Sequence, residues 1–446
     1  MLFIKFSGLR AIHTYFICIL IALSSSLVVF SQDTEDQDYF KELFIRNEDF
    51  IYKPNIKTVL LYKAGWEMSQ PIIQLNTDDK MILTFDDLDA DDKYFGYTII
   101  HCNANWQESE LKQNEYIDGY YEDEIWDYAY SYNTTKAYTN YRIELPTDYL
   151  RLTKSGNYIL RVYEDENTDE NVIFTRRFMV LDPKVSVAAR VNPTSNVADR
   201  QTKQAVDFTI YKNNYLIPFP FEKLKVVITQ NRRWDNAITD LKPRLVSYDK
   251  ISYDYDEGNV FDGGNEFRHF DIKSTIYQTE NMKNKFYDAT GYHVFLLPDE
   301  RRTFDRYTFQ EDLNGKLYIE AENAGDANIE GDYIFIHFKF PYEVPLVNGN
   351  LYIMGALTNW QFTEEGRLTY NFQEKAYETI MYLKQGYYNY VYVFLEDGYP
   401  GADVTLMEGS HWDTENDYTI FVYHREEGTY YDQLIGLQFL NSLYKD

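Results

Sequence analysis

The adjacent residues His101 and Cys102 have the side chains of a thiol nucleophile and its general base. Residues 94–102 predict a β-strand, in which successive side chains point to opposite faces, so the two groups would not normally touch. A free, buried cysteine commonly acts as a small apolar core residue. We therefore interpret both residues as core, assign no catalytic residue and expect a protein that is not an enzyme.

An acidic cluster between two predicted strands offers oxygen ligands that could hold a calcium ion: Asp86, Asp87, Asp89, Asp91 and Asp92. It lacks the glycine and terminal glutamate of an EF-hand loop, and charge runs usually face water, so we interpret it as a solvated turn. The remaining histidines lack zinc-protease spacing and a nearby cysteine. We therefore expect no metal and no cofactor. A glycan hydrolase would need two carboxylates at a defined separation, and no pair is singled out.

Residues 97–141 are rich in tyrosine, tryptophan and amide side chains. Tyrosine offers a large contact area at low entropy cost, with a polar tip that tolerates a wet rim. This pattern favours a binding protein, and its candidate partner-contact residues are Trp106, Tyr116, Tyr120, Tyr132, Arg232 and Arg233. For the two arginines, internal ion pairs with the abundant carboxylates are the alternative interpretation, which we favour.

The charge of the chain limits the classes of partner. Its 446 residues include 71 acidic and 43 basic side chains, a formal net charge of −28. Nucleic acid and anionic lipid need a basic footprint, so the sequence argues against both. Aromatic residues make up 17% of the chain, which is ample material for hydrophobic cores. This length predicts about two to four domains.

Lys5 and Arg10 precede an apolar run over residues 11–30, the pattern of a secretory signal peptide. We predict cleavage after Ser31, which gives a signal peptide of residues 1–31 and no membrane span afterwards. The run is also long enough for an N-terminal membrane anchor, which is the alternative. Cys102 is then the one remaining cysteine, so no intramolecular disulfide is expected. An exported protein without disulfides suits a bacterial periplasm.

Short runs of β-branched and aromatic residues, separated by turn signals, predict an all-β fold of tandem β-sandwiches of the immunoglobulin-like or early-set type. Residues 32–183 are expected to form an N-terminal sandwich that ends near Pro183. A second β-rich domain is expected over residues 184–344, where Pro341 and Pro345 interrupt the pattern. Residues 345–446 are expected to form a C-terminal sandwich.

Residues 97–141 closely resemble the plug protein family of the bacterial type IX secretion system of Bacteroidota. The likeness continues in order along the chain, through residues 175–180 (TRRFMV), 230–238 (QNRRWDNAI), 265–272 (NEFRHFDI), 383–390 (LKQGYYNY) and 431–436 (YDQLIG). Tyr430 stands where the family usually has an arginine. The resemblance implies a non-enzymatic periplasmic protein at the inner face of the outer membrane. It would bind the outer-membrane translocon β-barrel and close its periplasmic opening.

The C-terminal part also resembles early-set, glycogen-binding-like modules at the level of the fold, in residues 352–360 (YIMGALTNW) and 386–398. Sugar binding in those modules uses exposed aromatic platforms, usually with a second tryptophan after the Asp-Gly turn. Tyr399 and Pro400 follow that turn here. An exported carbohydrate-binding protein is therefore the alternative function, with Trp360 and Tyr399 as the candidate sugar platform.

Overall fold

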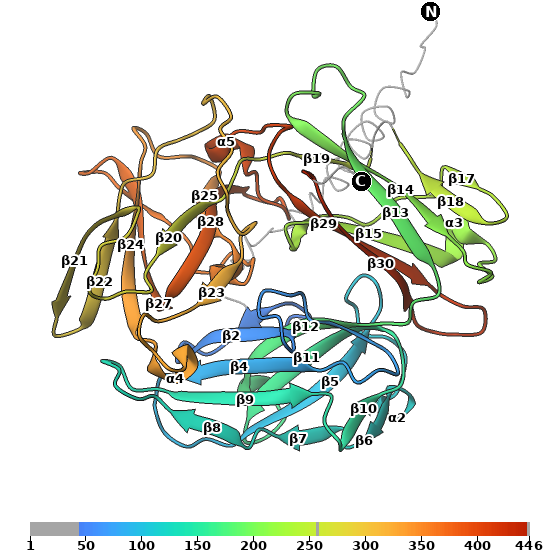
Figure 1. Ribbon diagram of the computed structural model, residues 1–446, viewed down its shortest axis with the longest axis horizontal. Coiled ribbons are helices and arrows are strands. Elements are labelled where there is room, and N and C mark those ends of the chain that lie inside the picture. Colours follow the sequence, from blue (N-terminus) through green and yellow to red (C-terminus); the bar gives the residue numbers. More distant parts are fainter. Residues whose placement is uncertain (1–43, 256–257, 444–446) are drawn as a thin grey trace, which may run out of the picture. The chain divides into compact units, whose positions relative to one another are not determined.

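The computed structural model describes residues 44–255 and 258–443, and the predicted signal peptide of residues 1–31 lies outside them. The described chain forms three pairs of packed β-sheets (Figure 1), which confirms the predicted all-β fold of β-sandwiches. Its helical turns are short: α2 (Gln113–Tyr116), η1 (Asp169–Asn171), α3 (Pro220–Lys223), α4 (Ala327–Glu330), η2 (Ala356–Thr358) and α5 (Thr405–Glu408). None of the helices in these two ranges has the length and hydropathy to cross a bilayer.

The first sandwich is built from two sheets. One has the order β1-β12-β11-β5-β7, with β3 beside β12, and consists of β1 (Phe50–Ile51), β3 (Ile72–Gln74), β5 (Phe95–Cys102), β7 (Glu122–Glu124), β11 (Gly156–Glu164) and β12 (Val172–Leu181). The other has the order β2-β4-β9-β8 and consists of β2 (Ile56–Lys63), β4 (Met81–Asp87), β8 (Asp127–Tyr130) and β9 (Thr139–Leu145). A separate ribbon pairs β6 (Ile117–Gly119) with β10 (Leu150–Leu152).

Aromatic rings fill the core between these two sheets. Phe85 of β4 stacks on Tyr141 of β9 with ring centroids 5.2 Å apart, and meets Phe95 of β5 edge-on at 5.3 Å. Tyr97 and Tyr158 are completely buried in the same core. Much of the tyrosine that enriches residues 97–141 therefore serves packing, since each ring buries a large apolar area.

The second sandwich combines two distant stretches of chain. One sheet has the order β13-β14-β18-β17, with β19 beside β14, and consists of β13 (Ser186–Pro193), β14 (Lys203–Tyr211), β17 (Leu245–Val246), β18 (Lys250–Tyr253) and β19 (Val260–Asp262). The other has the order β16-β15-β29-β30 and consists of β15 (Leu224–Gln230), β16 (Arg233–Ile238), β29 (Asp417–His424) and β30 (Gln433–Asn441). Val206, Val226 and Ile420 from both stretches share one core.

The third sandwich lies in the sequence between those two stretches. One sheet centres on β28 (Gly386–Glu396), which pairs with β20 (Arg268–Asp271), β23 (Leu317–Ile319) and β25 (Gly349–Met354). The other has the order β21-β22-β24-β27-β26 and consists of β21 (Met282–Asp288), β22 (Gly291–Leu296), β24 (Tyr333–Pro341), β26 (Thr369–Asn371) and β27 (Ala376–Lys384).

Strand pairing crosses the boundary predicted between residues 344 and 345, which corrects that division. Each of three pairs joins a strand before the boundary to a strand after it: β15 with β29, β20 with β28, and β24 with β27. Both later sandwiches therefore contain strands from both predicted segments. The physical reason is that proline and turn signals mark where strands end, while the choice of partner depends on contacts far apart in sequence. The stretch expected as the first domain does contain all strands of the first sandwich.

An apolar interface joins the first and second sandwiches. Cys102 and Trp106 pack there against Phe421 and Leu434. At its edge the buried Asp432 carboxylate pairs with Lys225 at 2.9 Å and Arg425 at 2.8 Å, and accepts the Ala104 backbone amide at 3.1 Å. Because β5 packs on its own core with one face and on this interface with the other, residues 95–102 form a nearly continuous apolar run.

A buried ion pair joins the first and third sandwiches. The Asp86 Oδ2 atom of β4 lies 2.7 Å from the Lys384 ammonium of β27, and both side chains are at most 1% exposed. The Tyr333 hydroxyl donates to the same carboxylate oxygen at 2.6 Å. Asn140 donates to the other oxygen at 2.7 Å, and Lys384 lies 4.2 Å from the centre of the Tyr138 ring. We call this group the Asp86–Lys384 cluster.

Candidate contact surface

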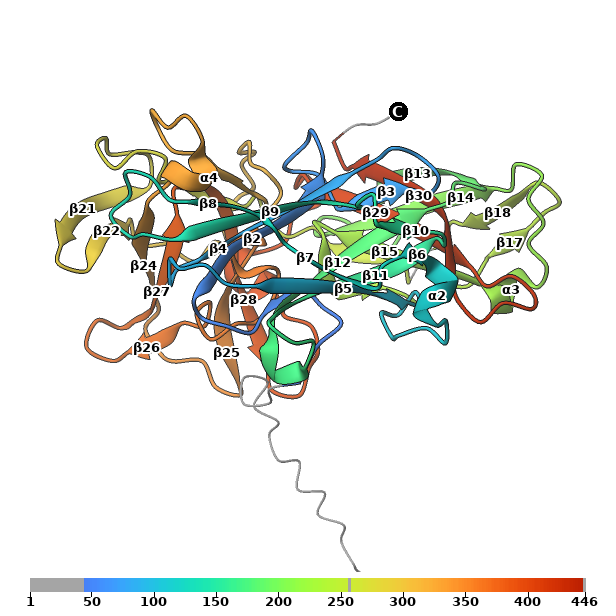
Figure 2. The same cartoon turned by 90° about the horizontal axis from the view of Figure 1, so that it is seen from below.

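Exposed aromatic side chains gather on the first sandwich, most of them on the side away from the other two. They lie on or beside β6, β7 and β8, along the lower margin of Figure 1; Figure 2 views the molecule from that side. Each has at least 42% of its surface exposed: Tyr94, Tyr120, Tyr121, Trp126, Tyr128, Tyr130, Tyr132 and Tyr149. We call these eight residues the aromatic face. Tyr132 lies beside the third sandwich, where its backbone amide donates to the Ile329 carbonyl at 2.8 Å. Isolated exposed rings are ordinary, whereas a cluster of them indicates a binding surface.

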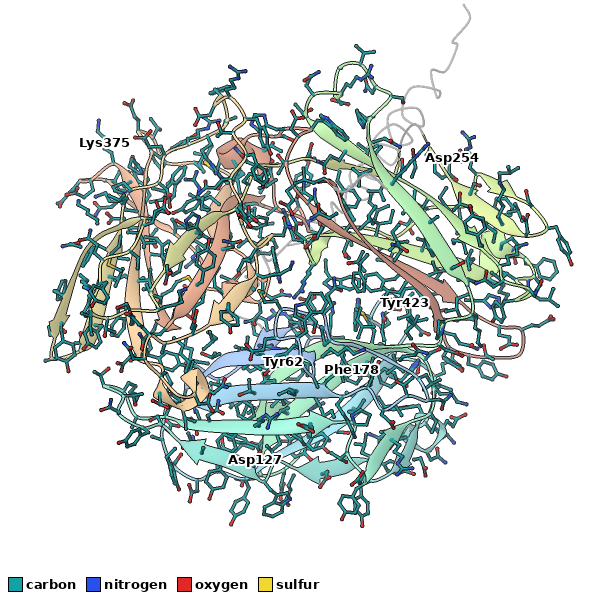
Figure 3. All side chains as sticks on the ribbon, in the orientation of Figure 1. Tyr62, Asp127, Phe178, Asp254, Lys375 and Tyr423 are labelled. Atoms are coloured by element: carbon teal, nitrogen blue, oxygen red, sulfur yellow. The ribbon has the colours of Figure 1, made fainter. Side chains whose placement is uncertain are left out.

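Two end strands carry the centre of the aromatic face. β7 ends one sheet and β8 ends the other, so each has one edge without a neighbouring strand in the described chain. All four side chains of β8 are exposed, and Asp127 at its start is labelled in Figure 3. Free strand edges present unpaired backbone donors and acceptors, and a partner strand can add to them.

Contacts between rings hold parts of the aromatic face in place. Tyr120 stacks on Tyr149 with centroids 6.0 Å apart, and Tyr128 meets Tyr130 edge-on at 5.9 Å. The Tyr130 hydroxyl donates to Asp92, and this hydrogen bond raises the pKa of Tyr130 to about 12. The Tyr130 phenol therefore stays neutral at physiological pH. The four rings offer hydroxyl groups together with apolar area.

The aromatic face has an acidic rim. Residues 118–130 include five carboxylates and no lysine or arginine. Because charged groups around an interface select partners of opposite sign, the surface favours a partner whose apolar patch is bordered by basic or amide side chains. The arrangement suits protein binding, with the rings as anchors and the carboxylates as the rim.

The structure places the sequence-predicted tyrosines and tryptophan in two different environments. Tyr120 and Tyr132 belong to the aromatic face. Trp106 and Tyr116 are only 6% and 3% exposed, which corrects their assignment as partner contacts: Trp106 packs edge-on against Trp234 at 5.1 Å, and Tyr116 lies in the first core. A tyrosine-rich sequence alone does not separate rings that fill a core from rings that face solvent.

The two predicted arginines are also internal. Arg233 is 4% exposed and pairs with Asp235 at 2.6 Å, as the ion-pair interpretation expects. Arg232 is half-buried and donates to the Met68 carbonyl, across the junction between sandwiches. Neither arginine belongs to the aromatic face.

His101 and Cys102, whose side chains could take part in catalysis, have structural roles. Burial raises the pKa of the Cys102 thiol to about 12 and lowers the pKa of His101 to about 4, so at neutral pH the thiol is protonated and the imidazole uncharged. The two point to different sides of β5: Cys102 to the inter-sandwich interface, and His101 to Ser109 at 2.9 Å and the ring of Tyr158. An activated pair has the opposite protonation states, a thiolate beside a charged imidazolium.

The acidic cluster at residues 86–92 is only partly solvated, which corrects the interpretation of a solvated turn. Asp86 and Asp87 are fully buried. Asp86 pairs with Lys384, and the Lys93 ammonium lies 2.8 Å from Asp87 and 2.5 Å from Asp89. Internal lysines thus neutralise the carboxylates. Within the described ranges, no group of three or more acidic, histidine or cysteine side chains is arranged to hold a metal ion.

The two residues of the candidate sugar platform lie in separate loops of the third sandwich. Trp360 is half-buried beside Phe267, at 6.1 Å between ring centroids, and follows the turn that contacts Gly315. Tyr399 is 63% exposed in the turn after β28. The two rings therefore do not form one surface, which corrects their pairing in the sequence analysis.

Sequence reasoning missed most of the aromatic face. Trp126, Tyr128 and Tyr149 were not singled out, although a signal is present: Tyr128 and Tyr130 alternate along one strand, and carboxylates surround Trp126. Large rings within a run of acidic residues are poorly suited to a core, because buried carboxylates need partners.

Comparisons with known proteins give two informative findings. A family model described as "Type 9 secretion system plug protein 1st domain" matches residues 56–182. The crystal structure of a hypothetical protein from Parabacteroides merdae is 35% identical, with a TM-score of 0.86; the match covers 89% of this chain and all of that one. No match to a curated protein was found.

Two further solved structures are weakly similar. The major pilin subunit BcpA of Bacillus cereus is 10% identical with a TM-score of 0.14, and the match covers 47% of this chain and 60% of that one. The C-terminal domain of BspA from Streptococcus agalactiae is 8% identical with a TM-score of 0.15, over 86% and 98% of the two chains. Similarity this low supports no inference about this chain.

Proposed function

This chain belongs to the type IX secretion system plug protein family, and we propose that it binds the outer-membrane translocon β-barrel of that system and occludes its periplasmic opening. The proposed site of action is the periplasm, at the inner face of the outer membrane. The role is one of contact and occlusion, without a chemical step. A channel wide enough for folded cargo would leak when idle, and a protein that covers its mouth prevents this.

The aromatic face is the observation that carries the proposal. It combines eight exposed rings of the first sandwich with two strand edges that have no neighbour in the described chain and with an acidic rim. Buried tyrosine and tryptophan dominate the binding energy of many protein interfaces. We assign this face to contact with the translocon.

The buried contacts between the sandwiches support an occluding role. The Asp86–Lys384 cluster, the Asp432 ion pairs and the apolar interface around Trp106 join the first sandwich to both of the others. A body whose parts are joined by buried contacts can cover an opening without the entropy cost of ordering separate domains on binding.

The test is co-purification with a tagged translocon from cells. The triple variant Tyr120→Ser, Trp126→Ser, Tyr128→Ser removes three rings of the aromatic face. Truncating a hot-spot ring typically costs 2 kcal/mol or more, about a 30-fold loss of affinity for each one. We expect the unmodified protein to be recovered with the translocon and the triple variant to be lost.

A matched control variant removes three exposed rings elsewhere: Tyr248→Ser, Phe304→Ser and Tyr399→Ser, at positions 95%, 87% and 63% exposed. It should co-purify like the unmodified protein. Failure of the unmodified protein to associate with a translocon empty of its other partners would reject the proposed function. Equal losses in the triple and control variants would reject the assignment to the aromatic face.

A further inference from the structure

A cavity of about 160 Å³ lies where the three sandwiches meet. Its wall includes Met68 from the first sandwich, Trp234 from the second, and Tyr318 and Trp360 from the third. Tyr62, labelled near this junction in Figure 3, also lines it. We call it the junction cavity. Its volume corresponds to about five water molecules at roughly 30 Å³ each.

The wall of the junction cavity carries more cationic than anionic side chains, although the protein as a whole is acidic. Its wall holds four cationic side chains and two carboxylates: Arg176, Arg177, Arg232 and Lys316 against Asp49 and Glu67. Lys316 is neutralised by Asp417 at 2.7 Å. The chain as a whole has a net charge of −28, so an excess of cationic side chains at this junction runs against its overall composition.

Among the described residues, two of these arginines have no carboxylate at ion-pair distance, and Asp49 and Asp417 attract Arg176 and Arg232 only from further away. Arg176 is 4% exposed and donates only to neutral oxygens: the carbonyls of Thr175 at 2.9 Å and Val59 at 3.2 Å, and the Asn359 side chain at 2.9 Å. Arg232 donates to the Met68 carbonyl. Neither one forms an ion pair with any carboxylate in residues 44–255 and 258–443.

Several other cations in the interior of this chain, unlike the buried Arg176 and the half-buried Arg232, have carboxylate partners. Lys384 pairs with Asp86, Arg233 with Asp235, and Arg268 with Glu408 at 3.0 Å. A buried charge without an opposite charge is costly. That cost is visible at both arginines, because burial lowers the pKa of Arg176 and of Arg232 to about 10. An anion in the cavity would offset it.

The wall also limits the kind of anion. Trp234, Trp360 and Tyr318 surround the cavity with aromatic rings, and Met68 and Met179 add apolar surface. Guanidinium groups bind planar carboxylates well, and aromatic walls favour an apolar group attached to the anion. We propose that the junction cavity binds a carboxylate carried on an apolar or aromatic group, held by Arg176 and Arg232.

A free small acid and the C-terminal residue of a polypeptide both present this carboxylate. Both would therefore be bound by the same contacts to the arginines. The inference does not rest on the proposed function. The test is calorimetric titration of the purified full chain with benzoate and with the tripeptide Gly-Gly-Phe. Benzamide and the C-terminal amide of the tripeptide have the same shapes without the charge.

Saturable binding of benzoate, with at least tenfold weaker binding of benzamide, is the expected result. Arg232→Gln should weaken benzoate binding at least tenfold, and Arg190→Gln should leave it unchanged, because Arg190 is an exposed arginine of the second sandwich. On the unmodified protein, affinity should fall as salt rises, which tests the charge independently of any variant. Binding of Gly-Gly-Phe in addition would assign the site to polypeptide termini, and binding of benzoate alone to free acids.

Three results would overturn the inference: no saturable binding of either carboxylate, equal affinity for benzoate and benzamide, or unchanged affinity in folded Arg232→Gln. If Arg232→Gln does not fold, the comparison of acid with amide and the salt dependence decide the question on the unmodified chain.

Discussion

Removal of one partner from the Asp86–Lys384 cluster should strongly destabilise the protein. Lys384→Met leaves the Asp86 carboxylate without its ammonium partner, and Asp86→Asn leaves the ammonium uncompensated. Both side chains are at most 1% exposed, so solvent does not replace the lost partner. Breaking a buried ion pair by removing one partner costs about 3–5 kcal/mol.

The surroundings of the ion pair reduce the expected loss of stability. In Lys384→Met, the carboxylate still accepts hydrogen bonds from Tyr333 at 2.6 Å and Asn140 at 2.7 Å, which stabilise its charge in part. In Asp86→Asn, burial already lowers the pKa of Lys384, so the lysine can lose its proton. We therefore expect about 3 kcal/mol for each single variant, at the lower end of the range.

Urea denaturation followed by tryptophan fluorescence measures the free energy of unfolding of the two single variants and the double variant. The double variant should be less destabilised than the sum of the singles, because it leaves no unpaired charge. Lys339→Met is the control on the neighbouring strand β24. Lys339 pairs with Glu374 and Glu378, both at 3.1 Å, at the surface, where such pairs contribute about 0–1 kcal/mol.

Two results would contradict this prediction: single variants that lose less than 1 kcal/mol of stability, or single effects that simply add in the double variant. Either result would mean that the first and third sandwiches are not joined through this pair.

Three further predictions concern pH and folding. Burial raises the pKa of Glu266 to about 7 from 4.5, so the folded state holds the proton more tightly and stability falls as pH rises between about 4.5 and 7. Glu266→Gln should remove up to about 3 kcal/mol of this loss of stability, because each pKa unit corresponds to about 1.36 kcal/mol. Urea denaturation at pH 5 and at pH 8 measures the difference. Burial lowers the pKa of His101 to about 4, so stability falls as pH drops from 6.5 to 4. In His101→Gln this loss of stability should be smaller. The same dependence of stability on pH in the variant would contradict the lowered pKa of the buried imidazole. A fragment of residues 345–446 should show no stable β-structure by circular dichroism, because β27, β28 and β29 lose their partners β24, β20 and β15.

The sequence predicted the fold class well because the strand signals are local. Runs such as residues 156–163 and 333–340 alternate or carry β-branched and aromatic residues, and they lie within β11 and β24. The nesting of the third sandwich within the second was not predictable in this way. It depends on the pairing of β15 with β29, two strands separated in the sequence by all strands of the third sandwich.

The candidate contact surface was only partly predictable, for a different reason. Tyr116 and Tyr120 lie in one short segment of the tyrosine-rich block, yet one is buried and the other 62% exposed. The difference arises because Tyr116 ends α2 facing the core, while Tyr120 follows the outer ribbon strand β6. Trp106 is buried by the second sandwich, whose strands are distant in sequence. Burial at such positions follows from tertiary packing and not from residue type.

Site-specific photo-crosslinking in cells is the sharpest test of contact between the aromatic face and the translocon barrel. The photoreactive amino acid p-benzoylphenylalanine would replace Trp126 or Tyr128 on the aromatic face, with Tyr248 of the second sandwich as the control position. We predict crosslinks to the translocon barrel from both positions of the aromatic face and none from position 248. Crosslinks from position 248 with none from the aromatic face, or no crosslink to the barrel at any position, would contradict the account.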